Sequence, residues 1–275
     1  MSDVSVVEKC QNAAKEMRKD VIRAAYSCGK NSAHIGGSLS MVDIMAALYL
    51  GVMNIGKNKL HSDDRDRFIL SKGHCVLAQY TALKQIGVIT DEELLTFKQS
   101  GTRLYAHSTC DRDIGIEFST GSLGQGISLA VGVALALKKK NSSCRVFTLL
   151  GDGECNEGSV WEALASASHF GLNNLTVIVD RNRLQHDGFT EEILSMGDLS
   201  EKFSAFGLDT KTVDGHDMNA LLSALEYTGS KPVAIIADTV KGKGVSFMEN
   251  SPNWHSGRMN ENQFNSAMSE MEGAE

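Results

Sequence analysis

Two short apolar segments, each ending in a polar motif, constrain the fold of this chain more than any other feature. Residues 145–150 read RVFTLL and run into a GDG motif at 151–153, and residues 174–179 read NLTVIV and run into a DRN motif at 180–182. Short apolar segments of this kind are typical of buried parallel strands. The residues between them suffice for one helix and a return, so both motifs should lie at the carboxyl edge of one sheet, where open α/β folds bind ligands.

The side chains at these two strand ends predict a particular kind of ligand. Asp152 and Asn182 would converge at the sheet edge, and Gly151 and Gly153 would let a ligand come close to the backbone. Carboxylate and amide oxygens are ligands that Mg²⁺ accepts in proteins. The pair therefore suits Mg²⁺ carrying a diphosphate.

The rest of the chain alternates apolar strand-like segments with helical patterns. This alternation predicts an α/β fold, a doubly wound and mostly parallel sheet with helices on both faces. With only two prolines and no low-complexity stretch, residues 1–275 are expected to form one domain. The strand-like segments are 67–70, 145–150, 174–179 and 232–238, with a short segment at 210–215, and the helical ones include 6–28, 41–50, 160–170 and the acidic tail.

Composition excludes several classes of protein. The 27 Lys and Arg against 34 Asp and Glu give a net charge of −7, which argues against nucleic acid as a partner. No run of 18 apolar residues and no signal-peptide pattern occurs, so no membrane partner is expected. The six cysteines are scattered without a CxxC motif, which indicates reduced thiols in a cytoplasmic protein.

Several longer motifs carry a family resemblance. GDGECNEGSVWEA at 151–163, followed by NLTVIVDRNRLQ at 174–185, closely resembles the thiamine-diphosphate signature of transketolases. The resemblance continues in order over nearly the whole chain, through the stretches SAHIGGSLS (32–40), RFILSKGH (67–74), STGSLGQGIS (119–128) and TVKGKGVSFMENSPNWHSG (239–257). It implies the thiamine-diphosphate-binding fold of that family.

The resemblance also implies a metal site and a diphosphate site. Mg²⁺, or Ca²⁺ or Mn²⁺ in its place, would be held by Asp152, Asn182 and the backbone carbonyl of Leu184. Charge counting leaves about two negative charges on the metal–diphosphate group and Asp152 together. We expect imidazole donors and a helix N-terminus to satisfy them without a lysine cluster. The cofactor-binding residues implied are His74, Gly121, Leu123, Gly151, Asp152, Gly153, Glu154, Glu162, Asn182 and His255.

The resemblance also assigns catalytic roles to four positions, one of which is His255. His34, His107 and His255 would contact the donor sugar and move its protons, since a neutral imidazole can both donate and accept. Glu157, with Glu162, would belong to a buried acidic network between subunits, whereas helix-dipole compensation is the structural alternative. Gly121 and Leu123 would lie under the aminopyrimidine ring. The other histidines are expected to have no such role, although one of them, His186, stands where the family usually carries an apolar residue beside the cofactor: His61, His169, His186 and His216.

The chain ends at Glu275, before the part of a transketolase that carries the glutamate activating the cofactor. We therefore expect the pyrimidine-binding and C-terminal domains to be absent, and the chain to be the N-terminal subunit of a split transketolase. A C-terminal subunit would complete it, as a heterotetramer with two copies of each chain. The expected reaction transfers a two-carbon ketol unit from a ketose to an aldose, whose sugars could be phosphorylated, sulfonated or branched.

Two alternatives stay open at this point. The chain could be half of another thiamine-diphosphate enzyme, of the deoxyxylulose-phosphate synthase or ketoacid dehydrogenase type. It could also be a non-catalytic scaffold subunit of the same fold. The histidine set and the STGSLGQG loop favour transketolase, and intact Asp152 and Asn182 argue against a scaffold.

Overall fold

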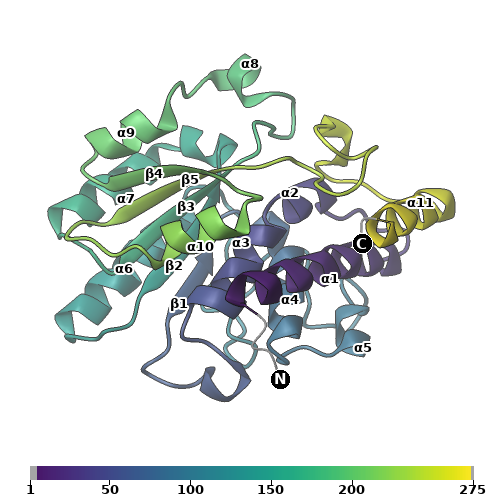
Figure 1. Ribbon diagram of the computed structural model, residues 1–275, viewed down its shortest axis with the longest axis horizontal. Helices are drawn as coiled ribbons and strands as arrows, with labels where there is room; N and C mark the ends of the chain where they lie inside the picture. The colour runs from purple at the N-terminus through teal and green to yellow at the C-terminus, as the bar shows by residue number, and fades with distance from the viewer. Residues whose placement is uncertain (1–4, 274–275) are drawn as a thin grey trace.

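A five-stranded sheet organises the computed structural model, which describes residues 5–273 (Figure 1). The strand order is β1-β2-β3-β5-β4, and all four pairings are parallel. The expected α/β class is therefore confirmed, and the short segment near residue 210 forms the edge strand. The strands are β1 (Arg67–Leu70), β2 (Val146–Gly151), β3 (Leu175–Arg181), β4 (Asp209–Asp214) and β5 (Val233–Asp238).

The register of the central strands places the two polar motifs side by side. Gly151 at the end of β2 is the partner of Asp180 in β3, and Arg181 of β3 is the partner of Asp238 in β5. Because the strands are parallel, these residues share the carboxyl edge of the sheet. The prediction that Asp152 and Asn182 emerge at one edge is confirmed.

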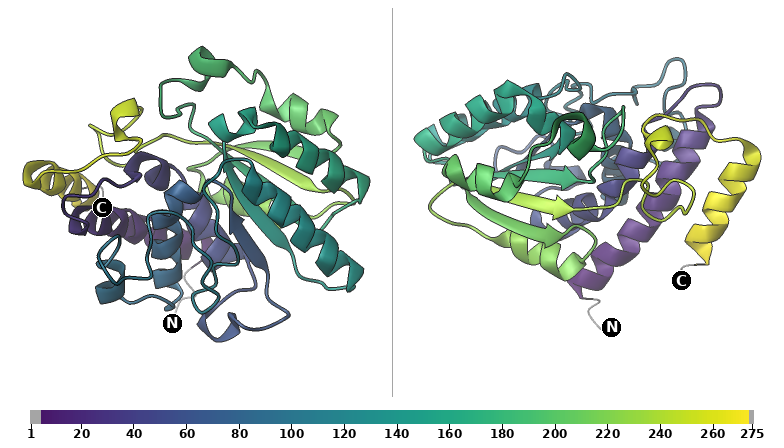
Figure 2. Two further views of the ribbon diagram at one scale, coloured as in Figure 1. Left: turned by 180° about the vertical axis from the view of Figure 1, so that it is seen from behind. Right: turned by 90° about the horizontal axis from the view of Figure 1, so that it is seen from above.

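Helices cover both faces of this sheet, and each face has its own core (Figure 2). Phe147 and Leu149 of β2 point into one core, whereas Val146 and Leu150 of the same strand point into the other. This alternation follows from the two-residue period of a strand. The first core includes α1 (Val6–Ser27), α3 (Val42–Ala47), α4 (Val76–Gln85) and α10 (Met218–Glu226), and the second includes α6 (Gln125–Lys139), α7 (Gly158–His169) and α9 (Leu199–Ala205).

The helix expected at residues 41–50 has a different shape in the structure. It divides into α3 and a π-helical turn, η1 (Leu48–Val52). Close packing accompanies this turn, since a Cβ added at Gly51 would lie 2.5 Å from Cδ2 of Leu222. The remaining short elements are α2 (Ile35–Ser40), η2 (Lys57–Lys59), η3 (Gly73–Cys75), α5 (Asp91–Leu94), η4 (Gly153–Asn156), α8 (Thr190–Leu194) and η5 (Pro252–Trp254).

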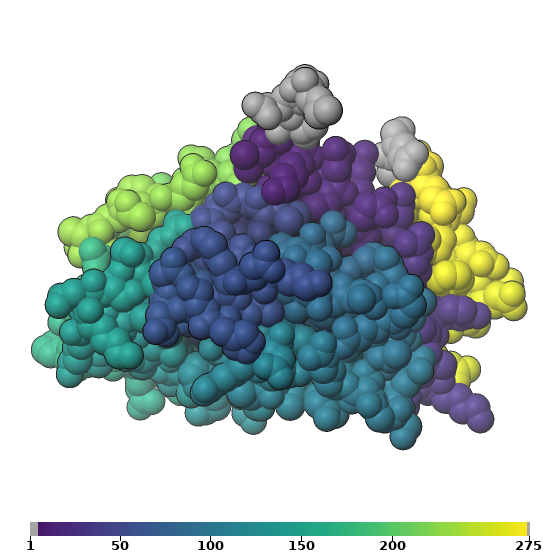
Figure 3. Space-filling view, turned by 90° about the horizontal axis from the view of Figure 1, so that it is seen from below, coloured from purple at the N-terminus to yellow at the C-terminus, as the bar shows by residue number. Residues whose placement is uncertain are grey.

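The acidic tail forms α11 (Glu261–Glu272), which lies along α1. The rings of Tyr26 and Phe264 stack between these helices with centroids 4.3 Å apart. The space-filling view from below shows α1, in purple, beside α11, in yellow, while the segment before β1, in dark blue, covers the centre of that face (Figure 3). Among residues 5–273, no helix is long and apolar enough to cross a membrane. The six cysteines are free thiols.

Candidate functional site

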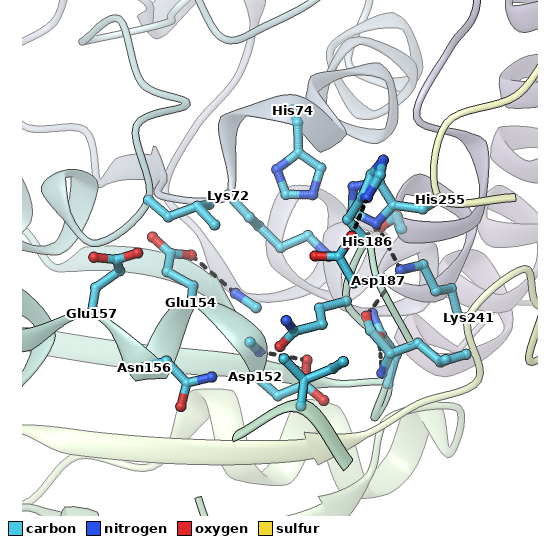
Figure 4. A pocket seen from close by; sticks show the side chains of 18 of the residues that line it. Lys72, His74, Asp152, Glu154, Asn156, Glu157, His186, Asp187, Lys241 and His255 are labelled. Carbon is cyan, nitrogen blue, oxygen red and sulfur yellow. Dashed lines mark hydrogen bonds and ion pairs between the residues drawn. The ribbon is translucent and has the colours of Figure 1, made fainter. Parts of the chain in front are cut away.

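A cavity of about 550 Å³ opens at the carboxyl edge of the sheet (Figure 4). Its walls come from the ends of β2 and β3 and from the loops that follow β1 and β5. Parallel strands bring these loops together although they are far apart in the sequence. Of the residues expected at the site, the cavity is lined by His74, His107, Gly121, Leu123, Gly151, Asp152, Gly153, Glu154, Glu157, Asn182, Leu184 and His255.

The two polar residues at the strand ends are both buried. Oδ1 of Asp152 accepts a hydrogen bond from the N–H of Gly153 at 2.8 Å, and its other oxygen accepts one from the N–H of Arg183. Oδ1 of Asn182 accepts from the N–H of Leu184 at 3.1 Å. Burial, and next the nearby charge of Asp180, raise the pKa of Asp152 to about 6. A buried carboxylate of this kind favours a cation beside it.

Beneath these residues, the Asp180 carboxylate contacts four side-chain donors from different parts of the chain. Its carboxylate forms an ion pair with Lys72 and accepts hydrogen bonds from Ser40 (2.6 Å), Thr239 and Nδ2 of Asn182 (3.2 Å). Burial alone would raise the pKa of Asp180, but the charge of Lys72 holds it below its usual value. Because Asp180 holds the nitrogen of the Asn182 amide, the oxygen is directed to the other side.

Two lysines line the cavity beside the expected imidazoles. Lys72 is almost fully buried in its pair with Asp180. Nζ of Lys241 lies 2.9 Å from the carbonyl oxygen of Leu184 and 2.9 Å from Nδ1 of His255. Burial lowers the pKa of Lys241 to about 8, and the charge of Lys72 acts in the same direction. Each lysine stands beside a glycine just after a strand, which is the signal that could have identified it.

The histidines of the separate motifs form one cluster. The ring centroid of His34 lies 5.1 Å from that of His74, 5.5 Å from that of His107 and 5.4 Å from that of His255. Burial lowers the pKa of His34 to about 4 and that of His255 to about 3. These imidazoles are therefore neutral near pH 7 and can donate at one nitrogen and accept at the other.

One of the histidines for which no role was expected also lies at the cavity. His186 lines the cavity, and its ring centroid lies 5.2 Å from that of His255. Its Nδ1 lies 3.0 Å from Oδ1 of Asp187, so the ring is held at the mouth of the cavity. Its position two residues after Leu184, in an irregular loop, is what brings it to the site.

The glycine-rich loop before α6 is tied to the end of β2 through Glu154. The buried carboxylate of Glu154 accepts hydrogen bonds from the N–H of Gly124 at 2.8 Å and of Gly151 at 3.1 Å. Gly121 has φ = +138°, and a Cβ there would lie 2.8 Å from the ring of His107. A side chain at residue 121 would therefore displace His107. Leu123 of the same loop lines the cavity and stays 36% exposed.

The two acidic residues at the start of α7 are exposed on this chain. Glu157 occupies the N-cap position without a side-chain capping bond and lines the cavity, whereas Glu162 lies further along the helix and outside the lining. A buried acidic network could include them only if a second chain covered this surface.

The oxygen ligands present fit a divalent cation that brings further oxygens with it. Among residues 5–273, no group of three or more His, Cys, Asp and Glu side chains could hold a metal ion. Asp152, Asn182 and the Leu184 carbonyl instead provide one carboxylate and two neutral oxygens, and the carbonyl already faces the ammonium of Lys241. Such a set needs oxygens from a ligand such as a diphosphate to complete a Mg²⁺ shell.

Comparison with known proteins shows that this chain matches one domain of a known family. Residues 8–272 match the family described as "Transketolase, thiamine diphosphate binding domain". The chain is 38% identical over 268 residues to a subunit of the apulose-4-phosphate transketolase from Phocaeicola vulgatus, covering 96% of this chain and 94% of that protein. It is also 38% identical over 265 residues to the 6-deoxy-6-sulfo-D-fructose transketolase subunit SqwG of Clostridium sp. (strain MSTE9), covering 95% and 96%.

Solved structures show the same fold. A transketolase from Leishmania mexicana superposes with a TM-score of 0.86 at 28% identity, over 98% of this chain and 41% of that one. A transketolase from Campylobacter jejuni gives a TM-score of 0.83 at 26% identity, over 98% and 43%. The chain thus spans about two fifths of the length of these solved proteins.

Proposed function

Since this chain belongs to the transketolase family and matches its thiamine-diphosphate-binding domain, we propose that it holds the diphosphate end of that cofactor in a two-chain transketolase. The reaction is the transfer of a two-carbon ketol unit from a ketose to an aldose. The observation that carries the proposal is the placement of Asp152 and Asn182 at one sheet edge, beside two lysines and a cluster of histidines.

Asp152, Asn182 and the Leu184 carbonyl would hold Mg²⁺, or Ca²⁺ or Mn²⁺, together with the diphosphate oxygens. Lys241, His74 and His255 line the same cavity and would offset the remaining negative charge, whereas the charge of Lys72 is already balanced by Asp180. When bound, thiamine diphosphate supplies the electron sink needed to break a C–C bond next to a carbonyl. The loop at Gly121 and Leu123 would support the organic part of the cofactor.

The histidine cluster would act on the sugar. His34, His107 and His255 are neutral near pH 7, because burial lowers their pKa values. A neutral imidazole can donate its N–H to a sugar hydroxyl or carbonyl oxygen, and another can accept a hydroxyl proton. The ring centroids of His107 and His255 lie 5.4–5.5 Å from that of His34, so the three imidazoles would contact neighbouring groups of one sugar.

A second chain would complete the enzyme. The two relatives that this chain covers over 94–96% of their length are named as transketolase subunits. These names support a C-terminal partner subunit for this chain. Glu157, exposed at the edge of the cavity, and Glu162 would contact the other chains in a cytoplasmic heterotetramer of two copies each. The names of these relatives, which refer to a phosphorylated and a sulfonated sugar, support a substrate with an anionic terminal group.

The test is a ketol-transfer assay with thiamine diphosphate and Mg²⁺. We expect turnover when the chain is mixed with a C-terminal transketolase subunit from the same organism, and none with either chain alone. Full turnover by this chain alone would contradict the two-chain assignment. A mixture that forms a complex and binds the cofactor, yet transfers no ketol unit from any sugar phosphate or sulfonate, would contradict the reaction.

A further inference from the structure

His216, outside the cofactor cavity, bridges two parts of the molecule that are distant in sequence. It lies between β4 and α10, and its side chain is 15% exposed. Its Nδ1 lies 2.7 Å from Oδ2 of Asp43 in α3, and its Nε2 lies 2.9 Å from the backbone nitrogen of Val240. The ring thus connects α3 to the chain just after β5.

These two contacts determine the tautomer of the ring. The N–H of Val240 can only donate, so Nε2 of His216 must be the unprotonated acceptor. Nδ1 therefore carries the proton and donates it to Asp43. One neutral imidazole performs both tasks at once, and an aliphatic side chain could perform neither.

The carboxylate on the other side is itself fixed. Asp43 forms an ion pair with Arg18 of α1 and is 10% exposed. Burial would raise its pKa, but the hydrogen bond from His216 and the charge of Arg18 hold that pKa below its usual value. Arg18, Asp43, His216 and Val240 therefore form a chain of charge-assisted and ordinary hydrogen bonds.

This chain of bonds ends next to a residue of the cofactor cavity. Val240 immediately precedes Lys241, whose ammonium contacts Leu184 and His255 (Figure 4). On the other side, the N–H of Gly242 donates to the carbonyl of Gly36 at 3.0 Å. The backbone of Lys241 is thus held by backbone groups at its own carbonyl, which accepts from the N–H of Asn250 at 2.9 Å, and at Gly242, whereas on the Val240 side the His216 side chain holds it.

We propose that His216 is a positioning residue, which Asp43 and Arg18 orient so that it fixes Val240 and directs the ammonium of Lys241 into the diphosphate-binding cavity. The inference rests on the proposed function, because it assigns Lys241 to the diphosphate. Loss of one such hydrogen bond should weaken diphosphate binding about five- to tenfold.

A double-mutant cycle tests this proposal through cofactor affinity rather than activity. Thiamine diphosphate with Mg²⁺ is titrated into the complex with the partner subunit for the wild type, His216→Ala, Lys241→Met and the double variant. If His216 acts through Lys241, His216→Ala weakens binding in the wild type but adds less than about twofold to Lys241→Met. Equal effects of His216→Ala in both backgrounds would overturn the proposal.

Two further variants guard against misfolding. His61→Ala is the matched control, since His61 faces Asp113 at 3.7 Å on the exposed surface and should leave cofactor affinity unchanged. Asp43→Asn keeps the shape of the side chain and should show the same dependence on Lys241 as His216→Ala. If the wild type does not bind the cofactor at all, the proposed function fails. If it binds and neither His216→Ala nor Asp43→Asn changes the affinity, only this inference fails.

Discussion

The floor and the mouth of the cavity at the sheet edge differ in how far their side chains find partners within this chain. At the floor, Asp180 has no exposed surface and binds four donors from this chain. At the mouth, Leu123 is 36% exposed, Leu194 is 58% exposed, and the Glu157 carboxylate faces solvent. The polar groups of the floor therefore find their partners within this chain. The mouth instead has the exposed apolar and acidic surface that a second chain would cover.

This contrast separates two kinds of residue. Floor residues should govern the stability of the isolated chain, because each unpaired buried charge is costly. Mouth residues should affect stability little, but they should matter for assembly and turnover.

The largest effect is expected from Asp180→Ala. It leaves the buried ammonium of Lys72 without its partner and removes the acceptor for Ser40, Thr239 and Asn182. Breaking a buried pair in this way should lower the free energy of unfolding by about 3–5 kcal/mol. Urea unfolding of the isolated chain measures this change.

The matched control is the double variant Lys72→Met with Asp180→Leu. It removes both charges together, so it should recover much of the stability that Asp180→Ala loses. A loss below about 1 kcal/mol for Asp180→Ala would show that the floor is not held by this carboxylate.

A smaller effect is expected when the histidine cluster is protonated. Burial, and then the charge of His107, lower the pKa of His34 from its ordinary value of 6.5 to about 4 in the folded chain. Between these two values the unfolded chain binds the proton more readily, so acidification from pH 6.5 towards 4 destabilises the fold. His34→Asn should remove this contribution, on the order of 2 kcal/mol near about pH 4.5.

The measurement is the free energy of unfolding at pH 7 and near about pH 4.5 for both proteins. The wild type should lose more stability than His34→Asn on acidification. Parallel pH profiles for the two proteins would mean that His34 is not buried as a neutral imidazole.

The smallest effect on stability is expected at the mouth. Glu157→Gln and Leu194→Ser should each change the free energy of unfolding of the isolated chain by no more than about 0.5 kcal/mol. Both should nevertheless weaken association with the partner subunit in analytical ultracentrifugation. If both variants assemble and turn over normally, the claim that the residues of the mouth matter for assembly and turnover is wrong.

The sequence predicted those parts of the site that are visible in local patterns. Apolar strands ending in Asp152 and Asn182 predicted the sheet edge, and the motif histidines predicted the cluster around His34. Lys72 and Asp180 were missed as a pair because they are 108 residues apart and meet only through the strand order β1-β2-β3. For His186, the sequence offered only its place beside the cofactor in the family, because no periodic pattern tells which side chains of an irregular loop line a cavity.

The division of the helix near residue 41 was also beyond the sequence pattern. Its apolar residues are consistent with one continuous helix, and the π-helical turn coincides with close packing of Gly51 against Leu222. Contacts of that kind come from tertiary packing, which periodicity does not describe.

The most direct test of the central claim is a calorimetric titration with thiamine diphosphate, made in the presence of the partner subunit with and without Mg²⁺. We predict binding that requires the metal and falls at least about a hundredfold in Asp152→Ala, because the variant loses the only carboxylate among the proposed metal ligands. Binding that is equally tight without metal, or unchanged in Asp152→Ala, would contradict the claim that the ends of β2 and β3 hold the diphosphate.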